Sequence, residues 1–220
     1  MSTAERFSFL GCLQLLEVTP HEARDARELV TELERVPLES IFCHTAAALL
    51  HRPVLPEAYP NDFALWADTA TGDRRLAERL AAVDAFPSGA MQSVREELVT
   101  TVQDHLRHLP GPLPPAHGEP FRFLQVHLVP VPTGLEAGNL KEFRDALAEV
   151  DVSALFYHVI EARYRHPDGR SDFVEWIDHG LGQRELADRL AHIDPYIGSL
   201  ERLRDRHLSA LARALEERGD

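Results

Sequence analysis

Hydrophobic and polar residues alternate along two separate stretches of the chain, residues 7–18 and 121–129. In the second stretch the odd-numbered residues form one face and the even-numbered residues the other, which is the period of a β-strand. Pro130 and Pro132 follow, and we expect them to end this strand because proline has no backbone N–H to donate. A single strand is not stable alone, so the two predicted strands are expected to pair with each other.

Apolar residues recur at helical spacing after each predicted strand. A first helix is predicted at residues 21–36, with Ala26, Leu29, Val30 and Leu33 on its apolar face, and Leu140, Phe143, Leu147 and Val150 form the same pattern in the second half. Further helices are predicted at residues 39–51, 74–83, 88–107, 153–165, 184–193 and 199–217, with short ones around Phe63/Trp66 and Phe173/Trp176. The pairs Asn61-Asp62 and Ser171-Asp172 are predicted to begin helices, with Asp62 and Asp172 as helix caps, and Asp151 is predicted to cap a further helix. Such side chains accept hydrogen bonds from free backbone N–H groups.

The second half of the chain repeats residues of the first half. Twelve residues recur 110 positions later: Asp62, Phe63, Trp66, Asp68, Gly72, Arg74, Leu76, Ala77, Arg79, Leu80, Ala81 and Asp84. Chance would give about one or two identities over a stretch of this length. We interpret the pattern as a tandem duplication.

A proline-rich segment separates the two copies. Residues 110–120 contain Pro110, Pro112, Pro114 and Pro115, which are incompatible with a helix. The predicted organisation is a first copy at 1–109, a linker at 110–120 and a second copy at 121–220. The predicted fold class is mainly α. Each copy has one N-terminal strand followed by about five helices, and the strands pair across a pseudo-twofold axis.

The net charge and the spacing of the cysteines limit the partners and metal sites that are expected. The chain has 220 residues, with 36 acidic and 23 basic residues and a net charge of −13, so a nucleic-acid partner is not expected. No apolar window is long enough to span a bilayer, and the first residues lack the basic start and apolar core of a signal peptide. Cys12 and Cys43 form no CxxC pair. We predict a cytoplasmic protein that contacts no membrane.

Three short patterns occur in both halves: aromatic-x-His at Phe42/His44 and Phe156/His158, Asp-Phe-x-x-Trp after a polar cap, and Leu-Ala-x-Arg-Leu-x-x-x-Asp-x-aromatic. Together they resemble a bacterial and archaeal protein family of unknown function, here in two tandem copies. The resemblance covers nearly the whole chain and implies the N-terminal strand of each copy. The first copy departs from it at Ala85, where the second keeps Pro195. The resemblance implies no activity, substrate or cofactor.

His44 and His158 are the first candidate site residues. Each lies in the middle of a predicted helix among apolar neighbours, where a neutral imidazole needs a donor and an acceptor. We interpret both as core or interface histidines whose nitrogens are hydrogen-bonded. One alternative is a metal or haem site, in which the two rings face each other and Glu161 adds a carboxylate, and another is general acid–base chemistry. Ala47 stands at the position of Glu161 in the first half, which weakens the metal or haem alternative.

Two further repeated pairs, Trp66/Trp176 and Arg79/Arg189, are candidate ligand-binding residues. Aromatic residues three positions from Phe63 and Phe173 are typical of a helical core, and the arginines are expected to bridge Asp68 or Asp84 carboxylates. The alternative is a sensor cleft in which all four residues contact a small ligand.

The chain contains no glycine-rich phosphate loop and no HExxH, GxSxG or Cys-His motif. We therefore interpret it as a non-enzymatic helical binding or adaptor module that uses the cleft between its repeats. Its partner is a protein or a small molecule, and no cofactor is predicted. A metal- or haem-binding protein, with or without enzyme activity, is the alternative. The oligomeric state does not follow from the sequence.

Overall fold

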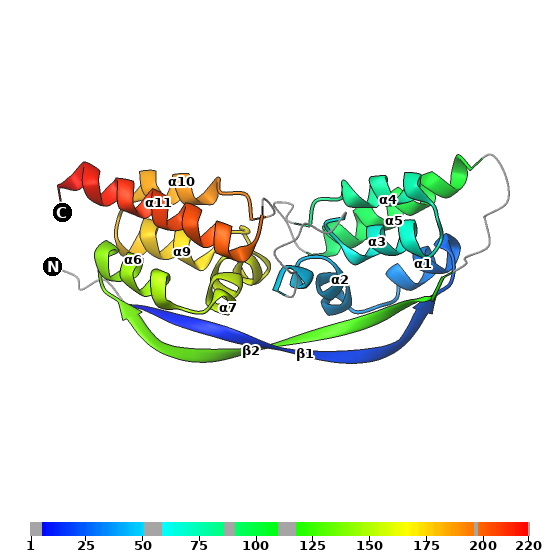
Figure 1. The fold of residues 1–220 in the computed structure, drawn as a ribbon, viewed down its shortest axis with the longest axis horizontal. Helices are drawn as coiled ribbons and strands as arrows, with labels where there is room; N and C mark the ends of the chain where they lie inside the picture. Colours follow the sequence, from blue (N-terminus) through cyan, green and yellow to red (C-terminus); the bar gives the residue numbers. More distant parts are fainter. Residues whose placement is uncertain (1–5, 51–58, 86–90, 110–117, 196–197, 220) are drawn as a thin grey trace. The chain divides into compact units, whose positions relative to one another are not determined.

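The computed structural model describes residues 6–50, 59–85, 91–109, 118–195 and 198–219. Most of the predicted linker, residues 110–117, lies outside these ranges. The two strands are β1 (Phe7–Ala23) and β2 (Phe121–Ala137), which form a two-stranded antiparallel sheet (Figure 1). The helices before β2 are α1 (Ala26–Leu33), α2 (Leu38–His44), η1 (Ala47–Leu50), α3 (Asp62–Thr69), α4 (Arg74–Ala81) and α5 (Met91–Arg107). Those after β2 are α6 (Leu140–Glu149), α7 (Val152–Leu155), η2 (Phe156–Glu161), α8 (Ala162–Arg165), α9 (Asp172–Glu175), η3 (Trp176–Gly180), α10 (Arg184–Ala191) and α11 (Leu200–Arg218).

The chain forms two compact units, and both strands are divided between them. Unit 1 comprises residues 1–13 and 128–220, and unit 2 comprises residues 14–127. The first part of β1 therefore belongs with α6–α11, and the first part of β2 belongs with α1–α5. Side chains tie the paired strands together inside each unit. Thr133 Oγ1 donates to Phe9 O in unit 1, and Thr19 Oγ1 donates to Phe123 O in unit 2, both at 2.7 Å.

The predicted fold class is wrong in its assignment of the strands to the two sets of helices. The prediction assigned each copy a strand from its own half of the sequence. In the structure, the helices of each unit pack against the beginning of the strand from the other half. A tandem pair of strand-plus-helix domains is therefore not the organisation of this fold, which is a two-stranded sheet shared by two helical units. The predicted boundaries at 1–109 and 121–220 likewise differ from those of the two units.

The physical reason is the packing of aromatic residues at the start of each strand. In unit 1 the ring centroids of Phe7 and Phe143 are 5.3 Å apart, and those of Phe9 and Phe173 are 6.0 Å apart. In unit 2 Phe121 stacks on Phe63 at 4.9 Å, and Phe123 is 6.1 Å from the same ring. These side chains are buried, and burial of such large aromatic surfaces dominates the energetics of a small core.

The predicted end of the second strand at Pro130 and Pro132 is also wrong. β2 continues through both prolines to Ala137, and β1 passes through Pro20. In a two-stranded sheet each strand has an unpaired edge, so a proline can sit with its missing N–H toward that edge. The exposed large hydrophobic side chains among the described residues lie in these strands, at Leu13, Leu15, Leu16, Val18, Val129 and Val131. The helices of each unit thus cover only part of each strand.

Polar side chains cap the beginning of several helices, and glycines precede two others. Asn61, Asp151 and Ser171 accept hydrogen bonds from backbone N–H groups of the first turns of α3, α7 and α9 and are the N-caps. Asp62 and Asp172, the predicted caps, are instead the first helical residues, and their carboxylates bind His44 and His158. Gly72 and Gly182 have φ values of +68° and +66°, a conformation that favours glycine, just before α4 and α10.

The last helix of each unit is held by an arginine that reaches a carbonyl just after the unit's first helix. Arg95 on α5 donates to Val36 O, and Arg204 on α11 donates to Val150 O at 2.7 Å. The last carbonyls of a helix have no partner inside it, so each guanidinium replaces a missing donor. Arg95 and Arg204 therefore occupy matching positions in the two units. Leu98 and His207, three residues further along each helix, also match, and both of their side chains are buried.

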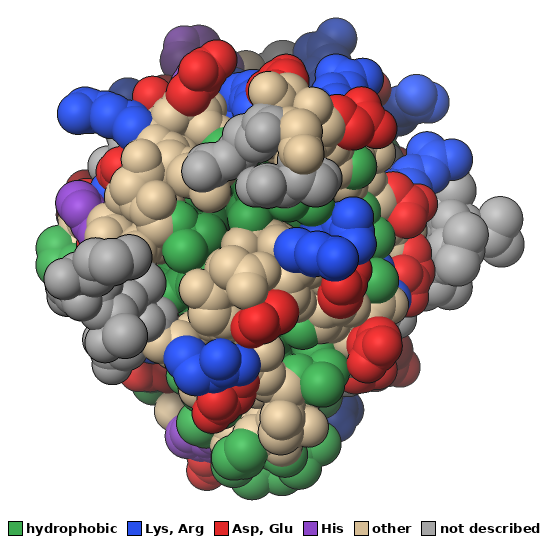
Figure 2. All heavy atoms as spheres, turned by 90° about the vertical axis from the view of Figure 1, so that its left-hand side faces the viewer, with side chains coloured by type: hydrophobic (Ala, Val, Ile, Leu, Met, Phe, Trp, Pro, Cys, Tyr) green, Lys and Arg blue, Asp and Glu red, His purple; other side chains and the backbone are tan. Residues whose placement is uncertain are grey.

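Acidic and basic side chains are interspersed on the face of unit 1 that Figure 2 shows, with apolar side chains between them. The acidic side chains therefore do not form one negatively charged patch on this face. None of the helices in the described part of the chain is both long and apolar enough to cross a bilayer.

Candidate functional site

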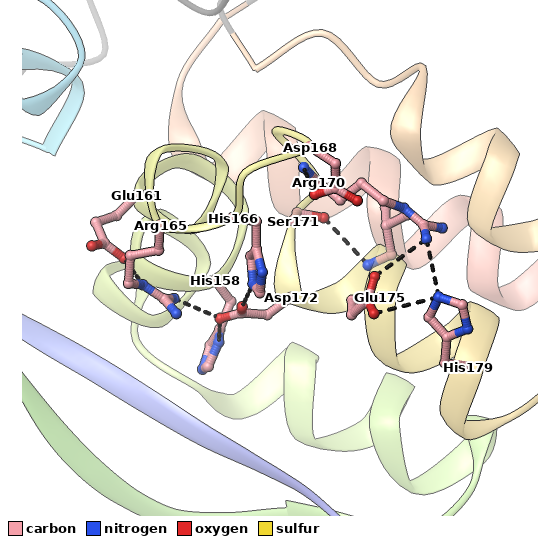
Figure 3. A network of polar contacts seen from close by, with 11 residues as sticks. His158, Glu161, Arg165, His166, Asp168, Arg170, Ser171, Asp172, Glu175 and His179 are labelled. Atoms are coloured by element: carbon pink, nitrogen blue, oxygen red, sulfur yellow. Dashed lines mark hydrogen bonds and ion pairs between the residues drawn. The ribbon is translucent and has the colours of Figure 1, made fainter. Parts of the chain in front are cut away.

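In unit 1 the carboxylate of Asp172 is surrounded by three hydrogen-bond donors (Figure 3). Its Oδ2 is 2.7 Å from His158 Nδ1 and 2.8 Å from Arg165 Nη2, and its Oδ1 is 2.7 Å from His166 Nε2. The other ring nitrogen of His158, Nε2, accepts a hydrogen bond from the backbone N–H of Leu10 at 2.8 Å. His158 is therefore a neutral ring with its proton on Nδ1, and it connects β1 to the helices of unit 1.

Two wide helical turns lie beside this network. The run α7–η2–α8 is a continuous helix whose middle part is a π-helix, and α9 continues into the π-helix η3. Such turns are rare and frequently occur at functional sites. At the second one, the Trp176 indole packs so closely over Gly180 that an added Cβ would be 2.9 Å from Trp176 Cδ1.

Burial and hydrogen bonding shift the pKa values of the network in opposite directions. Burial raises the pKa of Asp172, but its hydrogen bonds and the Arg165 charge outweigh burial and hold this pKa well below its usual range. Burial lowers the pKa of His158, more than the bond to Asp172 raises it. Burial also raises the pKa of Glu161, which is paired with Arg165. At neutral pH the network thus holds a charged Asp172 beside a neutral His158.

A second polar cluster, around Arg170, Glu175 and His179, lies to the right of Asp172 in Figure 3 and is closer to solvent. Arg170 donates to Asp178 at 2.7 Å and to Glu175 at 3.2 Å, and Glu175 is 3.4 Å from His179. The Arg170 bond lowers the pKa of Asp178. The two Arg170 pairs are part-buried, and the cluster is made of ion pairs among its own side chains.

Unit 2 contains the same histidine arrangement, with fewer partners among the residues that the structure describes. His44 Nδ1 is 2.9 Å from Asp62 Oδ2, and its Nε2 accepts from the backbone N–H of Leu124 at 2.8 Å. The Asp62 side chain is 39% exposed, whereas that of Asp172 is 16% exposed. Among the described residues, only His44 is hydrogen-bonded to the Asp62 carboxylate.

The exposed side of Asp62 forms one wall of a groove between α3 and the segment that leads into β2. The groove has a volume of about 350 Å³ and is lined by Asp62, Leu65, Trp66, Thr69, Ala70, Gly118, Glu119, Pro120, Phe121 and Arg122. These residues all belong to unit 2. Five of the lining side chains are apolar, and Asp62, Thr69, Glu119 and Arg122 add charged and hydroxyl groups. That composition is typical of small-molecule sites.

Two contacts hold the segment 118–119 against α3. The Trp66 indole Nε1 donates to Glu119 O at 3.0 Å, and Gly118 N donates to Ala70 O at 3.0 Å. A Cβ at Gly118 would be 2.6 Å from Ala70 Cα and 2.8 Å from Ala70 Cβ. Only glycine allows the two backbones to approach this closely.

Gly118→Ala is therefore expected to push this segment away from α3 and to lower the free energy of unfolding by about 1–3 kcal/mol, as overpacking does. The indole should lose its hydrogen bond to Glu119, and its fluorescence emission should move to longer wavelength. Gly138→Ala is the control, because its nearest neighbour is the flexible end of Arg6 at 3.1 Å. Equal stability and emission of the two variants would contradict the close approach at Gly118.

The structure places the other predicted site residues apart from this groove. Trp176 lies in unit 1 and stacks on Phe143, with ring centroids 5.2 Å apart. Arg79 is exposed on α4, and Arg189 pairs with Glu217 through two contacts of 3.2 and 3.3 Å. Of the four residues predicted for a ligand cleft, only Trp66 lines the groove.

The structure gives each candidate metal-binding histidine its own partners. His44 belongs to unit 2 and His158 to unit 1, and in each ring both nitrogens are hydrogen-bonded. Glu161 joins the network of unit 1 only through Arg165. Among the described residues, no group of three or more His, Cys, Asp or Glu side chains is arranged to hold a metal ion.

Sequence reasoning missed several residues of the network in unit 1 and of the groove in unit 2. Arg165 and His166 were not candidates, because they precede Pro167 at the end of a predicted helix, where exposed residues are expected. The segment 118–122 was not a candidate, because residues 118–120 belong to the predicted linker. Gly118 before a predicted strand was a usable indication, since an isolated glycine often marks close backbone approach.

Comparison with known proteins adds a family and a fold. No curated protein matches the sequence. The structure of OrfY from Thermoproteus tenax is similar, with a TM-score of 0.84 and 28% identity over 96% of each chain. The model of DUF5752, a family of unknown function, matches residues 4–212 as one segment, so two separate copies of the family are not shown. The chain therefore belongs to the DUF5752 family of unknown function.

Proposed function

We propose that this protein is a non-enzymatic binding module for a small molecule, and that the ligand binds in the groove of unit 2 beside α3. The observation that carries the proposal is the groove itself, with a volume of about 350 Å³, a lining of apolar and polar side chains and the half-exposed carboxylate of Asp62 in its wall. Volumes of this size hold small organic ligands, and a few polar groups fix their orientation.

The reactivity of the cysteines supports a binding role over nucleophilic chemistry. Both thiols are free and buried, and burial raises the pKa of Cys12 to about 11 and that of Cys43 to about 12. A thiol that stays protonated at neutral pH is a poor nucleophile. Free thiols also suit a reducing compartment, and a cytoplasmic location is part of this proposal.

Tryptophan fluorescence offers a direct test, because one of the two tryptophans lines the groove. In a Trp176→Phe background the emission comes from Trp66 alone. We expect at least one compound in a panel of charged and neutral metabolites to change this emission saturably and to raise the melting temperature of the wild-type protein.

A blocking variant shows whether binding takes place in the groove. Thr69 is exposed, lines the groove and donates its hydroxyl to Leu65 O at 2.8 Å, so Thr69→Phe should fill the groove and weaken binding at least tenfold. Thr31→Phe is the matched control, since Thr31 is also exposed on a helix and donates to Arg27 O at 3.1 Å. A panel in which no compound affects Trp66, or binding that Thr69→Phe leaves unchanged, would overturn the proposal.

A further inference from the structure

We infer that His158 is a pH-sensitive switch: its neutral ring holds the beginning of β1 on the helices of unit 1, and its protonated ring releases that segment. The contact that carries the switch is the hydrogen bond from the backbone N–H of Leu10 to His158 Nε2, at 2.8 Å. Both residues belong to unit 1, so the switch is independent of the groove in unit 2.

The neutral ring makes this contact and the protonated ring does not. His158 donates Nδ1–H to Asp172 Oδ2 at 2.7 Å, so its Nε2 carries a lone pair and accepts from Leu10. A second proton on the ring adds an N–H at Nε2, and two donors then face each other across 2.8 Å. The hydrogen bond is lost, and the two N–H groups repel each other.

The helices fix the ring, so the strand is the part that moves. The His158 ring stacks on Phe173, with centroids 5.6 Å apart, and Asp172 at the start of the same helix binds its Nδ1. Arg165 and His166 hold the Asp172 carboxylate in place (Figure 3). The pKa of Asp172 lies well below its usual range, so this carboxylate stays charged while the histidine titrates. A protonated His158 therefore keeps its bond to Asp172 and gives up the bond to β1.

The surroundings of the ring keep it neutral near pH 7. Rings and charges from three elements face it: Phe7 and Phe9 of β1, Asp172 and Phe173 of α9, and Tyr157 and Arg165 of the helical run α7–η2–α8. Burial and the Arg165 charge lower the pKa of His158 by more than the bond to Asp172 raises it. The unfolded chain titrates at about pH 6.5, so the contribution of this histidine to folding is complete above that pH and is lost as the pH falls through its folded pKa.

Release of the segment uncovers aromatic side chains of unit 1. Phe7 lies against Trp176 and Phe143, with ring centroids 5.5 and 5.3 Å apart. When residues 7–10 leave, water reaches the indole, and the emission of Trp176 moves to longer wavelength. The helices keep their own backbone hydrogen bonds, such as that from Phe143 N to Asn139 O at 3.0 Å. The expected event is therefore a local opening of the strand on helices that stay folded.

Amide hydrogen exchange, corrected for the intrinsic rate at each pH, measures this opening. It is followed from about pH 7 down to the pH at which NMR shows the His158 ring protonated. We expect protection of the Leu10 amide to fall at least tenfold more than that of the Phe143 amide, which reports opening of the helices. The protein carries His207→Leu, which removes the other buried histidine among the described residues of unit 1. With Trp66→Phe added, Trp176 emission should shift with the same midpoint.

His158→Gln is the matched control. The carboxamide oxygen of glutamine accepts from the Leu10 N–H, and the group does not titrate in this range. Protection of Leu10 in this variant should stay within about twofold over the same pH range. If the variant does not fold, the midpoints decide, because the loss of Leu10 protection must coincide with protonation of the His158 ring.

Three results would overturn the inference. The first is a parallel loss of protection at Leu10 and Phe143, which would mean that unit 1 unfolds as a whole. The second is a His158 ring that becomes protonated while Leu10 stays protected. The third is a loss of Leu10 protection that persists unchanged in His158→Gln.

Discussion

Replacing Asp172 with alanine is expected to lower the free energy of unfolding by about 3 kcal/mol, because it leaves the buried His158 ring without its acceptor and removes the hydrogen bonds from the more exposed Arg165 and His166. His158 Nδ1, Arg165 Nη2 and His166 Nε2 all donate to this carboxylate, and His158 also accepts from Leu10 in β1. Loss of the carboxylate should therefore weaken the hold of unit 1 on its strand. Urea unfolding measures the effect, with Trp176 fluorescence in a Trp66→Phe background as the probe of unit 1.

The acid range gives this prediction a second readout. The folded pKa of Asp172 lies below its unfolded value of about 3.9, so its contribution is complete above that value and is lost as the pH falls through the folded pKa. The stability difference between wild type and Asp172→Ala should thus be constant near neutral pH and should narrow below about pH 4.

Asp62→Ala is the matched control for Asp172→Ala. The Asp62 side chain is more exposed, and His44 is the described residue that is hydrogen-bonded to it, so its removal should cost only about 1 kcal/mol. Equal losses from Asp172→Ala and Asp62→Ala would show that the additional donors in unit 1 do not stabilise the fold.

His207→Leu is expected to stabilise the protein by about 3 kcal/mol near pH 4, with a much smaller effect at pH 8. His207 is fully buried on α11 and donates Nδ1–H to Leu203 O at 2.8 Å. Burial lowers its pKa to about 4, so the folded protein keeps the ring neutral well below pH 6.5. The unfolded chain binds a proton at about pH 6.5, and stability therefore falls as the pH decreases from 6.5 to 4.

Unit 2 provides the natural comparison for this substitution. Leu98 is buried at the matching position of α5, which shows that a leucine packs in such a site. Unfolding measured from pH 4 to pH 8 should show a shallower pH dependence for His207→Leu than for wild type. Leu98→His should have the opposite effect and steepen it. An unchanged pH profile of His207→Leu would mean that the ring is protonated or solvated in the folded protein.

The parts of the fold that depend on near neighbours were predictable. The helix positions follow from apolar spacing, and the helix starts at Asn61, Asp151 and Ser171 follow from side chains that accept hydrogen bonds within one turn. The π-helices at Phe156–Glu161 and Trp176–Gly180 were not predictable, because the wider turn leaves the order of apolar and polar residues nearly unchanged.

The candidate site was predictable only in part. His44, His158 and Trp66 stand out in the sequence because they recur in an apolar context. Arg165 and His166 do not, because their role depends on a carboxylate that belongs to the next helix. Gly118 and Glu119 contact α3 from a segment about fifty residues away in the chain, a distance over which no periodicity carries information.

The sequence by itself determined the helices, the polar residues at several of their starts, the paired strands and the likeness between the two halves. Only the tertiary structure decided which helices receive which strand, since Phe7 and Phe121 are the same residue type and either set of helices offers an aromatic partner. The tertiary structure also enclosed Asp172 and left Asp62 facing a groove. Local patterns specify which face of an element is buried, whereas long-range packing specifies what that face is buried against.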